Sequence, residues 1–360
     1  MKAVVLRKPR VLEYMDVPAP TLKQAEDVLV EVKACGICGS DLRYWEGENP
    51  WALHTLGRHV DNPPNIIMGH EYAGVVVQVN SAGYEHLLGR PVGVQPYRVC
   101  GRCEFCTSGH HNLCKTTIHT GHAQGWGELD FYPGAYAEYC VAWGDLVYPI
   151  PEGISFEEAA MADILGVAVH AVGRAKAPTG APVLCIGGGP VGLSIAQVAR
   201  VRGAGKVFVA ETSPIAQQVL SQFDIIVVDP KSIRDGSAAH IGRAEVAVIY
   251  DSVGTEETFS EAISLLDVCG VYVNLAVHSA SLSFNATQLG SERSVTTSSN
   301  AFYDDVREAY DLIYSRKVRT GPMVTHCLPL AEYRQAFDLL LSTPKQAYKV
   351  VFAPSSRRAS

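Results

Sequence analysis

The chain has 360 residues, of which 47 % are hydrophobic and 19 % charged, and its formal net charge is -7. This length is enough for two domains with cores of their own, and the composition is that of an ordinary globular protein. Because the balance is acidic and the basic residues are scattered, we expect no nucleic-acid partner. No apolar run is long enough to span a membrane, and Arg7 and Lys8 interrupt the first apolar stretch too early for a secretory signal. We therefore expect a cytoplasmic protein without a membrane partner.

The ten cysteines are too few for a disulfide scaffold in a chain of this length. In a reducing compartment, clustered cysteines indicate metal ligands instead. Four cysteines cluster between residues 100 and 114, and two more lie close to Ser40. The other four stand alone in apolar runs and are expected to be small core residues: Cys140, Cys185, Cys269 and Cys327.

The N-terminal part of the chain has the pattern of a β-rich domain. Residues 28–33 alternate in part, and the apolar, β-branched run 72–79 is typical of a buried strand. Between them, the pattern of residues 42–65 predicts a loop-rich segment. Its aromatic side chains either wall a substrate pocket or cover the domain's own core, and the sequence leaves both open.

Two short segments supply ligand types that zinc prefers. Cys38 offers a thiolate, and His70, about thirty residues on, offers an imidazole. The hydroxyl of Ser40 is placed to face whatever the metal binds, and Glu71 is an occasional ligand or an anchor beside the histidine. Catalytic zinc requires three protein ligands and one open position, so these segments leave one ligand missing. The alternative is a buried cysteine and a core histidine that never meet.

The most specific pattern in the sequence is Cys-x2-Cys-x2-Cys-x7-Cys. Four thiolates at this spacing can close a tetrahedron around one zinc and leave no position open, which predicts a structural site. The alternatives are four unrelated thiols or a nucleic-acid zinc ribbon, but a ribbon would have two separated Cys-x2-Cys pairs and basic neighbours. The histidines that follow are expected at the surface or at a pocket rim, with His119 and His122 the likelier pocket members; the other two are His110 and His111. The four predicted ligands are Cys100, Cys103, Cys106 and Cys114.

A helix is predicted from about residue 159 to residue 172, after a capping box formed by Ser155 and Glu158. Asp163 interrupts its apolar stretch. An unpaired buried carboxylate is costly, so Asp163 requires a partner, and a zinc ion would be one. Asp163 is therefore our candidate for the third zinc ligand. The alternative is that it points to solvent from the opposite face.

A glycine-rich motif directly follows the buried-strand run 182–186 and opens a helical stretch. This context gives the motif its meaning as a dinucleotide-binding turn. Gly187 permits the tight turn, Gly189 lets the backbone approach a pyrophosphate, and Gly192 allows the helix to pack closely on the strand. The helix N-terminus then offers free N–H groups to the phosphates.

Glu211 ends the next predicted strand, about twenty residues past the glycines. An acid at this position binds the ribose hydroxyls of NAD and would repel the extra phosphate of NADP, so we predict NAD. Further buried runs at 225–228, 246–249 and 271–275 alternate in part with helical stretches, which predicts a doubly wound parallel sheet. The last predicted strand, 348–352, is suited to rejoining the β-rich domain.

In their order and rough spacing, these motifs resemble those of the zinc-containing medium-chain dehydrogenases, above all the sorbitol (polyol) and threonine dehydrogenase branch. The resemblance covers nearly the whole chain. It implies an α/β fold with a β-rich GroES-like catalytic domain, residues 1–154 completed by 299–360, and a Rossmann domain for NAD, residues 155–298. It also implies a homodimer or homotetramer. The segments that carry it are 35–41, 69–71, the four-cysteine cluster, 187–192 and 325–330.

For the metal, the resemblance implies a catalytic zinc held by Cys38, His70 and the acid of the hinge helix, where Asp163 matches the usual Glu. Glu71 matches a carboxylate that binds the metal directly in some members. Asp41 is implied to be the partner of the zinc-binding histidine.

For the rest of the site, the resemblance implies Ser40 as the first member of a proton relay. Pro190 and Val191 join the glycines in binding the cofactor, and Tyr44 and Trp45 resemble the substrate pocket of the sorbitol enzymes. Two departures stand out. Arg43 occupies a position where many relatives have a histidine, and residues 297–300 lack the arginine that meets the polyol in sorbitol enzymes.

The resulting prediction is an oxidoreductase that binds two zinc ions and NAD and takes a small-molecule alcohol as substrate. It would transfer hydride from a secondary alcohol or polyol to NAD, with zinc polarising the alkoxide and Ser40 starting the proton relay. The alternatives are an NADPH-dependent zinc carbonyl reductase and a non-catalytic dinucleotide-binding homologue. A redox pair of Cys35 and Cys38 is disfavoured if Cys38 binds zinc.

Overall fold

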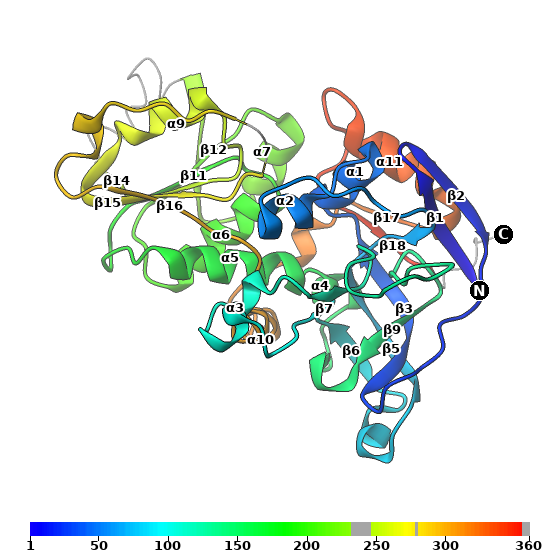
Figure 1. Cartoon of the computed structure of the whole chain (residues 1–360). Coiled ribbons are helices and arrows are strands. Elements are labelled where there is room, and N and C mark those ends of the chain that lie inside the picture. The colour runs from blue at the N-terminus through cyan, green and yellow to red at the C-terminus, as the bar shows by residue number, and fades with distance from the viewer. Residues whose placement is uncertain (232–245, 278–279, 355–360) are drawn as a thin grey trace. The chain divides into compact units, whose positions relative to one another are not determined.

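The computed structural model describes residues 1–231, 246–277 and 280–354 (Figure 1). The chain forms two compact units, one of Met1–Asp163 with Ala309–Ser360 and one of Ile164–Glu308. The domain boundaries expected from the sequence, after residues 154 and 298, stay a prediction. Among the described residues, no helix is both long and apolar enough to cross a membrane.

The first unit is built on a mostly antiparallel sheet with the order β10-β6-β5-β3-β18-β17, in which β9 also pairs with β3, and on a smaller sheet of β2, β1 and β4. The near-C-terminal strand β18 pairs antiparallel with β3, which confirms that the tail rejoins the N-terminal domain. The strands are β1 (Lys2–Lys8), β2 (Val11–Asp16), β3 (Asp27–Gly36), β4 (Ile66–Ile67), β5 (Glu71–Val79), β6 (Pro91–Val94), β7 (Tyr97–Arg98), β8 (Ile118–His119), β9 (Tyr139–Trp143), β10 (Val147–Pro149), β17 (His326–Leu328) and β18 (Val350–Phe352). The helices that lie wholly in this unit are α1 (Gly39–Glu46), α2 (Pro50–Leu56), α3 (Glu104–Thr107), α4 (Phe156–Ala160) and α11 (Tyr333–Leu341).

The prediction of a loop-rich segment at residues 42–65 is wrong for residues 42–56, which hold most of α1 and all of α2. Helix α2 begins with Pro50 at its first turn, and the Asn49 side chain accepts a hydrogen bond from the Ala52 N–H at 2.9 Å. Asparagine caps free N–H groups, and proline is pre-organised for the first helical turn. The Asn-Pro pair was therefore a helix start signal that the many aromatic residues obscured.

The helix expected at residues 159–172 is two helices. The capping box of Ser155 and Glu158 is confirmed, and it starts α4. The Met161 N–H then bonds to the carbonyl of Glu158, a tighter i to i−3 contact that ends α4. Helix α5 (Ala162–Arg174) begins directly afterwards, so Asp163 lies in the first turn of a new helix.

The second unit confirms the doubly wound prediction. Its described residues form six strands, all parallel, in the order β13-β12-β11-β14-β15-β16. Figure 1 shows α5 and α6 on one face of this sheet and α9 on the other. The strands are β11 (Val183–Ile186), β12 (Val207–Ala210), β13 (Ile226–Val228), β14 (Val246–Asp251), β15 (Leu266–Asn274) and β16 (Ser294–Thr297). The described helices that lie wholly in this unit are α6 (Pro190–Val201), α7 (Pro214–Leu220) and α9 (Glu256–Ile263). Helix α5 and helix α10 (Tyr303–Tyr314) each belong partly to this unit and partly to the first.

The lone cysteines divide into two pairs. Cys140 and Cys185 are buried, as expected, but Cys269 and Cys327 are exposed. Cys269 has a positive φ of 59°, which interrupts the regular alternation of β15. Cys327 lies on β17, the last strand at one edge of its sheet, where side chains alternate outward. An apolar run does not reveal which of its positions face outward.

Candidate active site

The register of two strands brings Cys38 and His70 together. β3 and β5 pair antiparallel with Gly36 opposite Glu71, so the residues after β3 and before β5 lie at the same end of the sheet. Cys38 caps the N-terminus of α1, and His70 directly precedes β5. The ligand atoms of Cys38, His70 and Glu71 all lie within 4.8 Å of one another. The alternative in which the cysteine and the histidine never meet is therefore wrong.

Asp163 lies beside the same histidine rather than on a solvent face. One of its carboxylate oxygens is 4.0 Å from His70 Nε2, and its side chain is 15 % exposed. Burial raises the pKa of Asp163 to about 6. A thiolate, an imidazole and a choice of two carboxylates form a donor set that fits zinc. Which of Glu71 and Asp163 serves as the third ligand stays a prediction.

His70 is held by a buried carboxylate. Its Nδ1 faces Asp41 Oδ1 at 3.5 Å, while Asp41 Oδ2 accepts hydrogen bonds from the Cys38 N–H at 2.9 Å and the Tyr136 hydroxyl at 2.8 Å. Burial alone would raise the pKa of Asp41, but His70 and these donors hold it below its usual value. Ser40 Oγ lies 3.5 Å from His70 Nε2. This arrangement fixes the ring, leaves Nε2 toward the predicted metal position and places the Ser40 hydroxyl there.

Sequence reasoning missed Lys349. This lysine is 2 % exposed, forms an ion pair with Glu71 and donates to the Ile37 carbonyl at 2.8 Å. Burial by itself would lower the pKa of Lys349, but the facing carboxylate raises it above its ordinary value. The sequence did contain a sign of this ion pair, a lysine directly before the apolar run 350–352. A charged side chain next to a buried strand requires a partner of opposite charge.

The two histidines that were the likelier pocket members are both buried, next to His70. His119 and His122 stack at a ring-centroid distance of 4.1 Å, and His122 meets the His70 ring edge-on at 4.4 Å. Tyr44 lies against His122 at 4.6 Å, and its hydroxyl donates to Asn49. Burial lowers the pKa of His122 well below its usual value, so its imidazole is neutral. Tyr44 is therefore connected to the metal centre indirectly, because it packs on His122, which in turn contacts His70.

Trp45 and Arg43 are also on α1, and their described contacts are with residues outside the metal centre. The Trp45 ring packs against Phe337 of α11, with 6.2 Å between ring centroids, and belongs to the border of the hydrophobic core. Arg43 Nε donates to Glu48 at 2.5 Å. The role of Trp45 in a substrate pocket stays a prediction, and its described contacts are those of a core residue.

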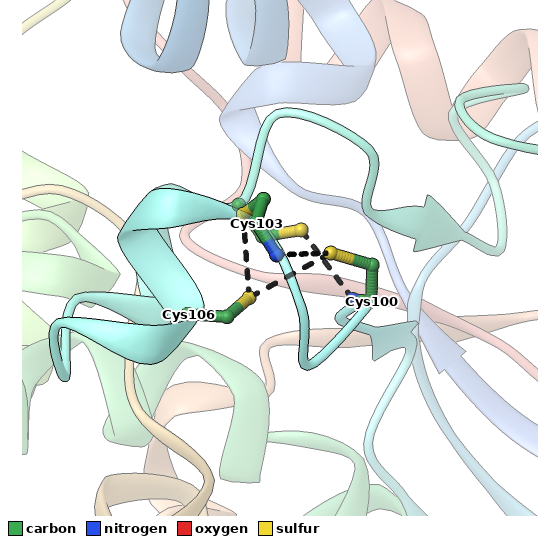
Figure 2. Close-up of side chains that lie close together, drawn as sticks. Cys100, Cys103 and Cys106 are labelled. Atoms are coloured by element: carbon green, nitrogen blue, oxygen red, sulfur yellow. Dashed lines mark hydrogen bonds between the residues drawn. The ribbon is translucent and has the colours of Figure 1, made fainter.

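The four clustered cysteines converge. Their sulfur atoms all lie within 4.8 Å of one another, with 3.9 Å from Cys100 to Cys106 and 3.6 Å from Cys103 to Cys106. Figure 2 shows these three side chains turned toward a common centre. Four thiolates on one zinc would lie about 3.8 Å apart, since each Zn–S bond is about 2.3 Å. The Cys114 sulfur also accepts from the Cys100 N–H, so the chain fits a closed structural site.

The glycine-rich turn has the expected construction. Gly187 has a φ of 88°, in the left-handed region that favours glycine. A Cβ on Gly192 would come within 1.9 Å of the Gly187 carbonyl oxygen, so no side chain fits there. Helix α6 begins at Pro190, with Gly189 as its N-cap and Val191 in the first turn. The first N–H groups of α6 are therefore left for an anion.

The Glu211 carboxylate sits against this turn. Its Oε2 accepts from the Gly188 N–H at 2.8 Å, and its Oε1 accepts from Thr212 and Ser213, each at 2.7 Å. These three N–H donors fix the position of the carboxylate. A negative charge is thus fixed at the end of β12, at the position expected from the sequence.

Asp251, at the end of β14, is a second residue that sequence reasoning missed. It is fully buried and accepts four hydrogen bonds, from the N–H groups of Val253 and Gly254, the Thr258 hydroxyl and the Tyr272 hydroxyl, at 2.6–2.9 Å. It shapes the turn after β14, and within that turn Ser252 bonds to the carbonyl of Ile186, just before Gly187. An aspartate at the end of an apolar strand was the available signal.

Two family models match the chain in the same order as its two units. Residues 24–152 match the alcohol dehydrogenase GroES-like domain, and residues 190–315 match the zinc-binding dehydrogenase model. A protein of Aspergillus clavatus named "Probable D-xylulose reductase A" is 31 % identical over 335 residues, covering 91 % of this chain and 89 % of that protein. The chain belongs to the zinc-containing medium-chain alcohol dehydrogenase family. Members of this family are oxidoreductases that act on CH–OH groups, and this dehydrogenase is one of them.

Solved structures agree with the fold of this dehydrogenase. A chain from E. coli CFT073, described as a short chain alcohol dehydrogenase complexed with cofactor NADH, has a TM-score of 0.85 and 25 % identity. It covers 98 % of this chain and 99 % of its own length. A zinc-binding dehydrogenase from Sinorhizobium meliloti 1021, bound to NADP, has the same TM-score, identity and coverage. Solved structures with this fold thus include one with NADH and one with NADP.

Proposed function

We propose that this dehydrogenase oxidises a secondary alcohol or polyol with NAD and carries a catalytic zinc and a structural zinc. One observation supports the catalytic part above all others. Cys38, His70 and two carboxylates meet at one end of the first unit's sheet, with the Ser40 hydroxyl beside them. No structural requirement of the fold explains such a convergence of a thiol, an imidazole and acids.

The side chains divide the work at this centre. Cys38, His70 and either Asp163 or Glu71 would hold the catalytic zinc, which supplies Lewis-acid polarisation of the substrate oxygen when bound. Asp41 holds the His70 ring through Nδ1 and keeps Nε2 free for the metal. Ser40 Oγ takes the hydroxyl proton of the substrate and passes it outward.

The choice of dinucleotide depends on Glu211. NAD supplies the hydride acceptor when bound. The Gly187–Gly192 turn and the start of α6 would hold its pyrophosphate, and the Glu211 carboxylate would accept hydrogen bonds from its ribose. The same charge would repel the additional phosphate of NADP. This argues against the alternative of an NADPH-dependent carbonyl reductase.

The substrate class is proposed from the relatives and from the chemistry of the site. The Aspergillus clavatus protein is named for the reduction of D-xylulose, a sugar ketone. For this chain we propose the reverse direction of that type of reaction, the oxidation of a secondary alcohol or polyol. A non-catalytic homologue is the second candidate, but such a protein would have no reason to keep Ser40 beside an intact ligand set.

The test is NAD reduction by the purified protein on secondary alcohols, sugar alcohols and threonine, each repeated with NADP, together with zinc analysis. We expect turnover with NAD, two zinc ions per chain, and a kcat/KM at least tenfold lower with NADP. Glu211→Ala should lower the ratio of kcat/KM with NAD to kcat/KM with NADP. Turnover that persists in Cys38→Ser and His70→Ala would exclude the proposed centre. Light scattering would test the proposed homodimer or homotetramer.

A further inference from the structure

His122 is buried with both ring nitrogens unpartnered. The residue is 6 % exposed, and among the described residues neither Nδ1 nor Nε2 has a hydrogen-bond partner. Its neighbour His119 differs, because His119 Nδ1 lies 2.7 Å from the Thr120 carbonyl and so donates to it. Buried polar groups are nearly always hydrogen-bonded, so an imidazole with two unused nitrogens indicates a ligand.

The surroundings of His122 restrict what that ligand can be. Tyr44 and His119 stack on the ring, with interplanar angles of 28° and 19°, and both rings are themselves buried. The ring faces are therefore occupied, and the nitrogens at the ring edge are what remains for binding. A neutral imidazole has one N–H donor and one acceptor nitrogen. A hydroxyl group can either donate or accept, so it can bond to whichever of the two nitrogens faces it.

His122 also lies beside the predicted metal centre. Ligand atoms of His122, His70 and Asp41 all lie within 4.8 Å of one another, and His70 is a predicted zinc ligand. A substrate whose oxygen is held at the metal beside His70 would bring its neighbouring groups close to the His122 ring.

We propose that His122 recognises a second hydroxyl of the substrate, on the carbon next to the one that is oxidised. The inference rests on the proposed function and narrows the substrate class to vicinal diols and polyols. It also explains the neighbouring rings. Tyr44, whose hydroxyl is engaged with Asn49, fixes the His122 ring by stacking, and His119 does so from its carbonyl-anchored position.

A competing explanation is that His122 supports Asp41. Asp41 Oδ1 has no hydrogen-bond partner among the described residues, and a water shared with His122 would satisfy both. In that case His122 would act on every substrate alike, by positioning Asp41 and thereby His70. The two explanations predict different substrate dependence, which makes them separable.

The experiment compares butane-2,3-diol with butan-2-ol. His122→Phe keeps an aromatic ring between Tyr44 and His119 but removes both nitrogens, and His122→Gln keeps one donor and one acceptor. We expect the ratio of kcat/KM for the diol to that for butan-2-ol to fall about tenfold in His122→Phe, as for the loss of a substrate hydrogen bond. His122→Gln should recover most of the ratio.

Equilibrium binding provides a readout that does not depend on turnover. Calorimetry of the zinc-loaded protein with NADH should show a Kd for the diol about tenfold higher in His122→Phe than in His122→Gln. Zinc content and the melting temperature check that each variant is folded, and His122→Leu replaces His122→Phe if the latter loses zinc.

The outcomes distinguish a failure of the hydroxyl-recognition role of His122 from a failure of the proposed function. Equal losses for both alcohols in His122→Phe, with an unchanged ratio, would overturn the hydroxyl-recognition role and leave the proposed function standing. A wild-type protein that oxidises neither these alcohols nor the wider panel, with both zinc sites filled, would overturn the proposed function and this inference with it.

Discussion

Lys349 and Glu71 form an ion pair that is closed off from solvent, with side chains 3 % and 0 % exposed. Glu71 is the first residue of β5 and follows the predicted zinc ligand His70, whereas Lys349 immediately precedes β18 near the other end of the chain. The C-terminal segment thus supplies the counter-charge for a carboxylate at the metal centre. We infer that the ammonium group competes with the metal for Glu71, which favours Asp163 as the zinc ligand.

Replacing Lys349 with methionine should destabilise the protein strongly. The substitution leaves the Glu71 charge buried and unpaired, which costs about 3–5 kcal/mol. The free energy of unfolding, measured in urea on the zinc-loaded protein, checks this. The matched control is the double variant Lys349→Met with Glu71→Gln, which should recover much of the loss. A double variant no more stable than the single one would contradict the ion-pair explanation.

Replacing Ser40 with alanine should lower kcat without removing zinc. Ser40 Oγ is 3.5 Å from His70 Nε2, close to the predicted metal position, but a hydroxyl is not one of the three predicted zinc ligands. Loss of a positioned proton-transfer group costs about 10²–10⁴-fold. Steady-state kinetics and zinc analysis check this, with Ser40→Thr as the variant that keeps a hydroxyl. Zinc loss in Ser40→Ala would instead indicate a ligand or structural role.

Replacing Cys103 with serine should remove one zinc per chain and lower the melting temperature. The four sulfurs form a closed set, so losing one ligand opens the tetrahedron and weakens a metal-dependent lobe. Zinc analysis and thermal unfolding measure the two effects. Cys327→Ser is the control, because Cys327 is exposed and lies outside the cluster. If both variants keep their full zinc content, the structural site is excluded.

His54 should make the stability pH-dependent. Burial, together with the charge of Arg43, lowers the pKa of His54 from 6.5 to about 4. Between these values the unfolded chain binds more protons than the folded chain, so stability is lost as the pH falls from about 6.5 to about 4. The maximal effect is roughly 3 kcal/mol, less where solvent screens the ring. The free energy of unfolding in urea, measured at several pH values, should fall less steeply with decreasing pH in His54→Gln than in the wild type.

Local patterns were sufficient for the elements and for the ligand types. The glycine-rich turn between β11 and α6, the capping box at Ser155 and the cysteine spacing each depend on neighbours a few residues apart. Such features are written directly into the sequence because turn geometry, capping and chelation act over short distances. Glu211 also appeared where the strand pattern placed it.

Local patterns failed where burial or a distant partner decided the outcome. His119 and His122 were expected as pocket members, but the sequence did not predict that they are buried and stacked on each other beside His70. Cys269 and Cys327 were expected in the core and are exposed. The helix break at Met161 depends on one i to i−3 hydrogen bond that the apolar periodicity does not encode. In each case the surroundings, and not the residue type, fix the exposure.

The sequence by itself determined the family, the order of the two units and the residues able to hold zinc and a dinucleotide, because each depends on spacing within short segments. Only the tertiary structure decided which of those residues meet. The β3–β5 register sets Cys38 against His70, and the return of the chain at β18 sets Lys349 against Glu71. Such contacts join residues far apart in the chain, and their energy comes from burial and charge pairing that exist only once the sheet has formed.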